Sequence, residues 1–223
     1  MGSAVEEQKR EAAAAARKTP DESEEDILET LPSDASDQLR QAISDLIQDK
    51  VVELDLSHDQ IVDQSAEALA SALKENASLK ELHLGWNKIA DKGAEALASA
   101  LKGHASLQKL YLLNNKIAGN GAEALAAALK GNASLKELHL RGNQIADKGA
   151  EALAVVLKGN ASLQKLTLGA NQITDKGVHA LAAALQENAS LEQLDLGGNT
   201  IADKGAEALA AIRSHLDLRT SPQ

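Results

Sequence analysis

A period of 28 residues runs from residue 51 to about residue 212 and restricts the possible folds more than any other feature. It holds without insertion across six units. Three rows of branched apolar residues repeat at this spacing: Val51, Leu79, Leu107, Leu135, Leu163 and Leu191; Leu54, Leu82, Leu110, Leu138, Leu166 and Leu194; and Leu56, Leu84, Leu112, Leu140, Leu168 and Leu196. Such self-similarity indicates a solenoid, in which each unit packs only against its neighbours.

The second and third rows form a Leu-x-Leu pattern, which is typical of a strand with one buried face. Alternate side chains of a strand point to opposite faces, so the leucines are expected inside and the residues between them outside. An Asn or Asp follows the strand in every unit: Asp59, Asn87, Asn115, Asn143, Asn171 and Asn199. Because an amide both donates and accepts, we expect stacked Asn side chains to bond the backbone of neighbouring units.

The second half of each unit predicts a helix, and Asp91–Ala98 shows the pattern clearly. Ala94, Leu97, Ala98 and Leu101 recur at helical spacing and form a narrow apolar stripe. We predict that Asp91 and its equivalents are the N-caps of their helices. With one Trp, one Tyr and no Phe in the chain, the core must be filled mainly by Leu, Ile, Val and Ala.

A strand, a turn, a helix and a return loop in 28 residues predict an α/β fold, a right-handed α/β horseshoe solenoid of about six leucine-rich repeats. Parallel strands are spaced by about 4.8 Å and packed helices by about 8 to 10 Å, so the strands should line the concave face and the helices the convex face. The sequence motif LxxLxLxxNxI, which recurs over residues 51–212, resembles the ribonuclease-inhibitor type of leucine-rich repeat.

Gly-Ala-Glu-Ala-Leu-Ala, beginning at Gly93, Gly121, Gly149 and Gly205, also resembles the GALA-type repeats of bacterial plant-pathogen effectors. Some of those effectors are ubiquitin-ligase adaptors that carry an F-box. Leu31-Pro32 matches the opening of an F-box, but the 18 residues that follow before the first strand are too few to complete one. The resemblance therefore implies a recognition module, located in the cytoplasm or, for an effector, secreted into a host cell cytosol.

Both ends of the chain depart from the repeat. Residues 1–32 contain five consecutive alanines and an acidic string, which predicts a disordered leader or a loose helix, either a solvated leader or a secretion signal or partner tail. Residues 33–50 predict a helical N-terminal cap with Leu39, Ile43, Leu46 and Ile47 on one face. Residues 213–223 begin with Arg213 at a position where the preceding units have Leu. They are either a C-terminal cap or tail, or the start of a truncated strand at Leu216 and Leu218.

The charge distribution bears on the class of partner. Residues 1–50 contain 6 basic and 13 acidic side chains, so this segment carries −7 of the net charge of −10. The repeats have no basic cluster, and we therefore expect no nucleic-acid or membrane partner. No apolar stretch reaches the roughly 20 residues that a bilayer requires, and the absence of Cys excludes disulfides and thiolate sites.

The outward strand positions are the candidate binding surface, because packing does not dictate their identity. The chain's only Trp and only Tyr lie there, together with His, Arg and Lys, and aromatic residues and Arg are enriched in interface hot spots. The predicted partner-binding patch spans units two to four and consists of His83, Trp86, Lys109, Tyr111, Leu113, His139 and Arg141. The competing interpretation is that the two aromatic residues are incidental surface groups.

We predict no catalytic, cofactor or metal site. His83 and His139 lie two strands apart, about 9 to 10 Å, which is too far for one ion. Ser57-His58-Asp59 places neighbours on alternate faces of a strand, and no phosphate-binding loop is present. Four Asn-Ala-Ser sequons, at Asn76, Asn132, Asn160 and Asn188, occupy one fixed repeat position, which favours a structural role over glycosylation.

These observations predict a non-enzymatic protein-binding scaffold, with an effector or adaptor as the narrower form. One alternative is a regulator that supplies Arg141 or an Asn to an enzyme, as some proteins with similar repeats do for small GTPases. The other is a consensus-like sequence without a natural partner. We expect a monomer, and a dimer through an open terminal strand is the other possibility.

Overall fold

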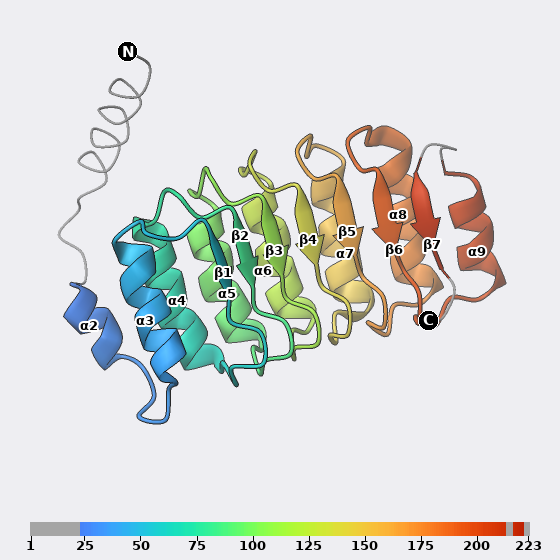
Figure 1. Ribbon diagram of the computed structural model, residues 1–223. Coiled ribbons are helices and arrows are strands. Elements are labelled where there is room, and N and C mark those ends of the chain that lie inside the picture. The colour runs from blue at the N-terminus through green and yellow to red at the C-terminus, as the bar shows by residue number, and fades with distance from the viewer. Residues whose placement is uncertain (1–22, 213–215, 221–223) are drawn as a thin grey trace, which may run out of the picture.

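The computed structural model describes residues 23–212 and 216–220, and within them it consists of one sheet layer and one helix layer (Figure 1). The sheet has seven parallel strands in chain order: β1 (Glu53–Asp55), β2 (Glu81–His83), β3 (Lys109–Tyr111), β4 (Glu137–His139), β5 (Lys165–Thr167), β6 (Gln193–Asp195) and β7 (Asp217–Arg219). The sheet is open, so the prediction of an α/β solenoid of stacked units is confirmed.

Eight helices are described. They are α2 (Glu24–Glu29), α3 (Asp37–Ile47), α4 (Asp63–Glu75), α5 (Asp91–Leu101), α6 (Gly119–Leu129), α7 (Ala146–Leu157), α8 (Asp175–Glu187) and α9 (Asp203–Ala210). Consecutive helices from α3 to α9 pack against each other along one side of the sheet (Figure 1). Among the described residues, no helix has the length and apolar character needed to cross a membrane.

The strands pair with a register of one repeat, and this register aligns the leucine rows. Leu82 of β2 lies beside Leu110 of β3, which lies beside Leu138 of β4. These leucines are at most 1% exposed, whereas the residues on either side of them in each strand are partly exposed. The alternation that the Leu-x-Leu pattern predicts is therefore present.

The Asn that follows each strand joins successive units, as we expected. Asn143 accepts a hydrogen bond from the Ile117 N–H of the preceding unit at 3.0 Å and donates to the Leu112 carbonyl of that unit at 2.9 Å. It also donates to the Leu140 carbonyl of its own unit at 2.9 Å. Asn87 and Asn115 make the equivalent three contacts, and all three side chains are buried.

The Asp at each helix start does not act as we predicted. Ala90, the residue before Asp91, occupies the N-cap position of α5, and its side chain makes no capping bond. Asp63 Oδ1, at the start of the preceding helix, instead accepts from the N–H groups of Ala90 and Gly93 at 2.7 and 3.0 Å. The cap is supplied across the repeat interface because stacking brings one carboxylate beside the free N–H groups of the next helix.

Helix α7 lacks this cap, because the preceding helix, α6, has Gly119 at the position where the other repeat helices have Asp. The following helix, α7, starts differently from the others. It begins at Ala146, whose φ of 51° lies in the left-handed region, and Ile145 before it is already helical. The missing carboxylate therefore coincides with an altered helix start in the next unit.

The four sequon asparagines are structural. Asn76, Asn132, Asn160 and Asn188 are 1 to 8% exposed. Each amide donates to a carbonyl near the end of the preceding helix, for example from Asn160 to Leu129 at 2.9 Å. The side-chain oxygen accepts from the core leucine that follows, for example from the Leu163 N–H at 2.8 Å. The amides thus form a second row of contacts between units.

The N-terminal end differs from prediction within residues 23–32. This part of the predicted leader forms α2, whose Ser23 and Asp26 bond reciprocally at the helix start. Ile27 and Leu31 are spaced by one helical turn and are buried in the core, at 2 and 7% exposure. The acidic string places three carboxylates in the first turn, where the helix dipole stabilises negative charge. The remaining leader, residues 1–22, lies outside the described residues.

Residues 33–50 contain α3, whose Leu39, Ile43 and Leu46 join the core and whose outer side packs on α2. At the other end, Leu218 of β7 pairs with Leu194 of β6. Of the two alternatives at the C-terminus, the structure therefore has the further strand. The step from Gln193 to Asp217 is 24 residues, shorter than the repeat, and α9 is correspondingly short. Arg213 lies outside the described residues.

Candidate functional site

The candidate site lies on the side of the sheet that the helices do not cover, which we call the strand face. It consists of the outward side chains of β1 to β7 and of the two positions after each strand. The inward leucines fix the backbone, and the parallel register places equivalent outward residues side by side. The residue types in each column therefore determine the chemistry of this surface.

Three rings form a continuous stack on the strand face. The His83 and Tyr111 rings have centroids 4.2 Å apart at an interplanar angle of 10°, and the Tyr111 and His139 rings are 4.4 Å apart at 9°. The rings come from adjacent strands, β2, β3 and β4, in the same register position. The structure thus brings together three of the predicted site residues. Tyr111 separates the two imidazoles, which agrees with our exclusion of a metal held between them.

A row of alternating charges lies beside the ring stack. Lys109 Nζ is 2.9 Å from a Glu81 carboxylate oxygen and 3.9 Å from one of Glu137. The hydrogen bond to Glu81 raises the pKa of Lys109 above its ordinary value. His139 Nε2 lies 3.1 Å from Glu137. Glu81 and Glu137 were not among the predicted site residues, although the Glu-Lys-Glu order of this column was the sequence signal for them.

Burial shifts the pKa of two of the three rings, Tyr111 and His139. It raises the pKa of the Tyr111 hydroxyl, so this group stays neutral and hydrogen-bond competent. Burial also lowers the pKa of His139 and outweighs the opposing effect of the Glu137 hydrogen bond. Both groups are therefore uncharged near neutral pH, so removing water from them costs less than it would for charged groups.

Trp86 forms a separate aromatic pair at the edge of the strand face. Its ring stacks on His58 at 5.4 Å and 11°, and 56% of the residue is exposed. Both residues have positive φ, 58° and 63°, at the turn that follows each strand. Leu113, another predicted residue, lies over Gly85 so closely that a Cβ there would be 2.9 Å from Leu113 Cδ2.

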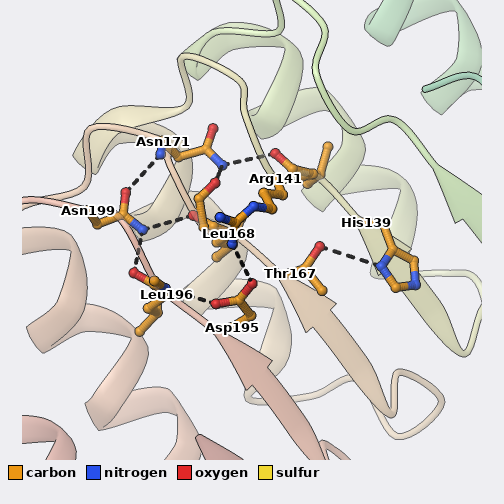
Figure 2. Close-up of polar contacts among 11 residues, drawn as sticks. His139, Arg141, Thr167, Leu168, Asn171, Asp195, Leu196 and Asn199 are labelled. Atoms are coloured by element: carbon orange, nitrogen blue, oxygen red, sulfur yellow. Dashed lines mark hydrogen bonds and ion pairs between the residues drawn. The ribbon is translucent and has the colours of Figure 1, made fainter. Parts of the chain in front are cut away.

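Arg141 lies on the strand face but is directed toward unit six (Figure 2). Its Nη1 donates to Asp195 Oδ2 at 3.2 Å, across β5. Gly169 leaves room for it, since a Cβ at that position would lie 2.7 Å from Arg141 Nη1. Asp195 also borders a shallow hollow of about 170 Å³ over β4 to β7. The structure therefore separates Arg141 from the ring stack and places it in a second polar group.

The residues of Ser57-His58-Asp59 have three different partners. The Ser57 N–H donates to Asp55 at 2.9 Å, His58 stacks on Trp86, and Asp59 accepts from the Ser36 hydroxyl at 2.7 Å. They do not form a chain of nucleophile, base and orienting acid. A different set, Glu53, Glu81 and His83, brings three potential metal-ligand atoms within 4.8 Å of one another.

The comparisons with known proteins agree with this geometry. A family model described as a leucine-rich repeat matches residues 75–98, and one described as the TMOD/LMOD leucine-rich domain matches residues 112–216. The chain is a leucine-rich-repeat protein. No curated protein matches the sequence of this leucine-rich-repeat protein.

Several solved structures are similar to this leucine-rich-repeat protein. A structure titled leiomodin-1 actin-binding site 2 is 25% identical, covers 61% of this chain and 79% of its own, and has a TM-score of 0.54. The tropomodulin C-terminal domain of Caenorhabditis elegans is 17% identical over 69% and 93% of the two chains, with a TM-score of 0.58. An internalin from Listeria monocytogenes is 23% identical over 79% and 49%, with a TM-score of 0.51.

The leucine-rich-repeat protein spans about half the length of that internalin. At these identities the internalin and the tropomodulin domain support the fold alone. Together with the TMOD/LMOD match and the leiomodin-1 likeness, the comparisons support a protein-interaction scaffold. The comparisons do not identify individual binding residues on the strand face.

Proposed function

We propose that this leucine-rich-repeat protein binds a partner protein on its strand face, with the contact centred on units two to four. The residues that carry the contact are His83, Trp86, Lys109, Tyr111, Leu113, His139 and Arg141. The main observation in support is the three-ring stack of His83, Tyr111 and His139, because it presents rigid, partly exposed aromatic surface in the middle of the sheet.

Rigidity matters because binding costs the conformational freedom of every side chain that becomes fixed. Tyr111 is held between two imidazoles, and Lys109 is held by Glu81, so both are ordered before a partner arrives. Trp86 adds exposed apolar area at the edge of the strand face. A partner with an apolar or aromatic centre and a mixed-charge rim would match this arrangement.

The test is affinity capture from a cell lysate with the unaltered chain and with a Trp86→Ala, Tyr111→Ala double variant. We expect the double variant to lose the captured partner while the melting curve keeps its cooperative shape. Val155→Ala is the matched control, since Val155 is 72% exposed on α7, in the opposite layer. Undiminished capture by the double variant would contradict the proposal.

A second candidate is that the partner is actin. The TMOD/LMOD leucine-rich domain model matches residues 112–216, and the leiomodin-1 structure that resembles this chain is titled as an actin-binding site. The matched segment begins one residue after Tyr111, includes Arg141 and Asp195, and ends just before β7. Co-sedimentation with purified actin tests this candidate, and the absence of binding at micromolar concentrations would remove it.

The narrower role of a bacterial effector or adaptor is supported only by the Gly-Ala-Glu-Ala-Leu-Ala wording, and a location in a host cytosol follows only from that role. The regulator of a small GTPase would use Arg141, which is already bonded to Asp195 and would have to leave it. A GTP hydrolysis assay with the unaltered chain and Arg141→Ala separates this role from simple binding. No acceleration by the unaltered chain removes the regulator.

A further inference from the structure

Three potential metal ligands lie close together in the N-terminal part of the strand face. Contacts within the ring stack and the row of alternating charges leave some of their ligand atoms free. Glu53 is on β1, and Glu81 and His83 are on β2. His83 Nε2 lies 3.7 Å from Glu53 Oε1 and 3.9 Å from Glu81 Oε2. One ligand atom from each residue lies within 4.8 Å of both others.

His83 Nε2 is buried from solvent and has no hydrogen-bond partner among the described residues. A buried polar atom without a partner is costly, and it commonly marks a position that an ion or a water satisfies. The stacking of the His83 ring on Tyr111 fixes its plane, so Nε2 is directed toward the two carboxylates before any ligand binds. Nothing else in the described part of the chain satisfies this atom at hydrogen-bond distance.

Two of the three ligand separations are near those of a tetrahedral zinc site, and the third is within 4.8 Å. With ligand bonds of about 2.0 to 2.1 Å, tetrahedral geometry separates the ligand atoms from each other by about 3.3 to 3.5 Å. The observed separations of 3.7 and 3.9 Å exceed this by a few tenths of an ångström. Glu53 is the most exposed of the three, with a side chain 68% exposed, so a rotamer change there meets little packing and closes the gap.

We propose that Glu53, Glu81 and His83 bind one Zn²⁺ ion. One imidazole and two carboxylates suit zinc, whereas Ca²⁺ and Mg²⁺ prefer six or more oxygen ligands. Lys109 bonds Glu81 through Oε1 at 2.9 Å, which leaves Oε2 for the ion and orients the carboxylate from outside. Three protein ligands leave a fourth position for water or for a donor group of a partner. The site does not depend on the proposed function.

The unit-four His provides a matched control. His139 occupies the same register position as His83 two strands away and also ends the ring stack. It faces one carboxylate, Glu137, at 3.1 Å, and it belongs to no potential metal cluster among the described residues. Loss of His83 and loss of His139 therefore shorten the stack equally but differ in their predicted effect on zinc.

The experiment is calorimetric titration of the full chain with zinc chloride at pH 7.5, together with the absorption spectrum of the Co²⁺-loaded chain. We expect one ion per chain and a tetrahedral cobalt spectrum. His83→Ala and Glu53→Gln should each weaken the affinity more than the roughly tenfold that loss of an outer partner costs, and His139→Ala should leave it unchanged. Absence of binding, or equal affinity in His83→Ala and the unaltered chain, would overturn the site. Glu53→Gln keeps the test decisive if His83→Ala misfolds.

Discussion

Asp63 Oδ1 accepts a hydrogen bond from the backbone N–H of Gly93 at 3.0 Å, thirty residues further along the chain. The same relationship joins Asp91 to Gly121 and Asp147 to Gly177. Each carboxylate also accepts from the residue at the N-cap position of the next helix. The helix caps of this solenoid are thus contacts between units, and they couple the stability of each repeat to that of its neighbour.

Loss of one such cap should lower stability measurably. Asp91→Ala removes the acceptor for the Ala118 and Gly121 N–H groups, and we expect the free energy of unfolding to fall by about 1 to 2 kcal/mol. Urea denaturation measures the change. Asp203→Ala is the control, because Asp203 begins α9 and no helix after α9 is present among the described residues for it to cap. Equal losses in the two variants would refute capping across the repeat interface.

Restoring the missing cap should have the opposite effect. Gly119→Asp supplies a carboxylate to the start of α7 and replaces a helical Gly. The nearest atoms to a Cβ there belong to the Lys148 side chain, at 3.1 Å, so this side chain must shift slightly. The Ala146 and Gly149 N–H groups already donate to the Asn171 and Ile145 carbonyls, so the new carboxylate must compete with these bonds. We therefore expect a gain of only about 0.5 kcal/mol from the cap, beyond the gain in helix propensity that Gly119→Ala gives alone. The comparison of Asp with Ala at this position by urea denaturation isolates the cap, and no difference between them would contradict its role.

The sequence predicted the backbone of this protein better than its polar contacts. The leucine rows and the Asn rows repeat at a fixed spacing. The Leu-x-Leu alternation allows only one face of each strand to be buried, so the fold and the Asn contacts could be predicted. The helix caps did not follow, because Asp63 and Gly93 become neighbours only through stacking. Arg141 and Asp195 are 54 residues apart and meet for the same reason.

The sequence indicated only in part which outward side chains lie together, for a similar reason. The register brought His83, Tyr111 and His139 together, since all three occupy the same strand position. Glu53 and Glu81, the proposed zinc ligands, were not predicted, because the order of charges in their column indicates ion pairs and does not show that His83 lies beside both carboxylates. The end of the leader was missed because Ile27 and Leu31 bury only against α3 and α4, and such tertiary burial overrides composition.

Replacing an Asn that follows a strand should lower the stability of the fold far more than replacing an exposed Asn. Asn143→Ala leaves the Ile117 N–H without its buried acceptor and removes one amide donor each from the Leu112 and Leu140 carbonyls; the Leu112 carbonyl keeps Asn115. An unsatisfied buried N–H costs about 1 to 3 kcal/mol and each further lost hydrogen bond about 0.5 to 1.5 kcal/mol, so we expect a loss of about 3 kcal/mol in the free energy of unfolding. Asn120→Ala, at an exposed position of α6, should cost less than about 0.5 kcal/mol. Thermal and urea denaturation of both variants provide the comparison.

Acid should weaken the fold through His139. Burial lowers the pKa of His139 in the folded state, so the unfolded chain binds the proton more readily. Stability from this group is present above the ordinary pKa of about 6.5 and is lost as the pH falls toward the lower, folded-state pKa. The denaturation midpoint should therefore decrease from pH 7.5 to pH 5.5. His139→Gln should show a smaller decrease, and an unchanged pH dependence would contradict this account.

The fold and the binding surface both depend on the inward direction of the strand leucines. Two adjacent residues of β3 test this direction. Leu110 is 1% exposed, whereas the Lys109 side chain is 32% exposed and makes ion pairs on the strand face. Urea denaturation should show a loss of about 2 to 5 kcal/mol in the free energy of unfolding for Leu110→Ala and less than about 1 kcal/mol for Lys109→Ala. Equal losses, or a larger loss for Lys109→Ala, would contradict the stacked solenoid and the binding surface built on it.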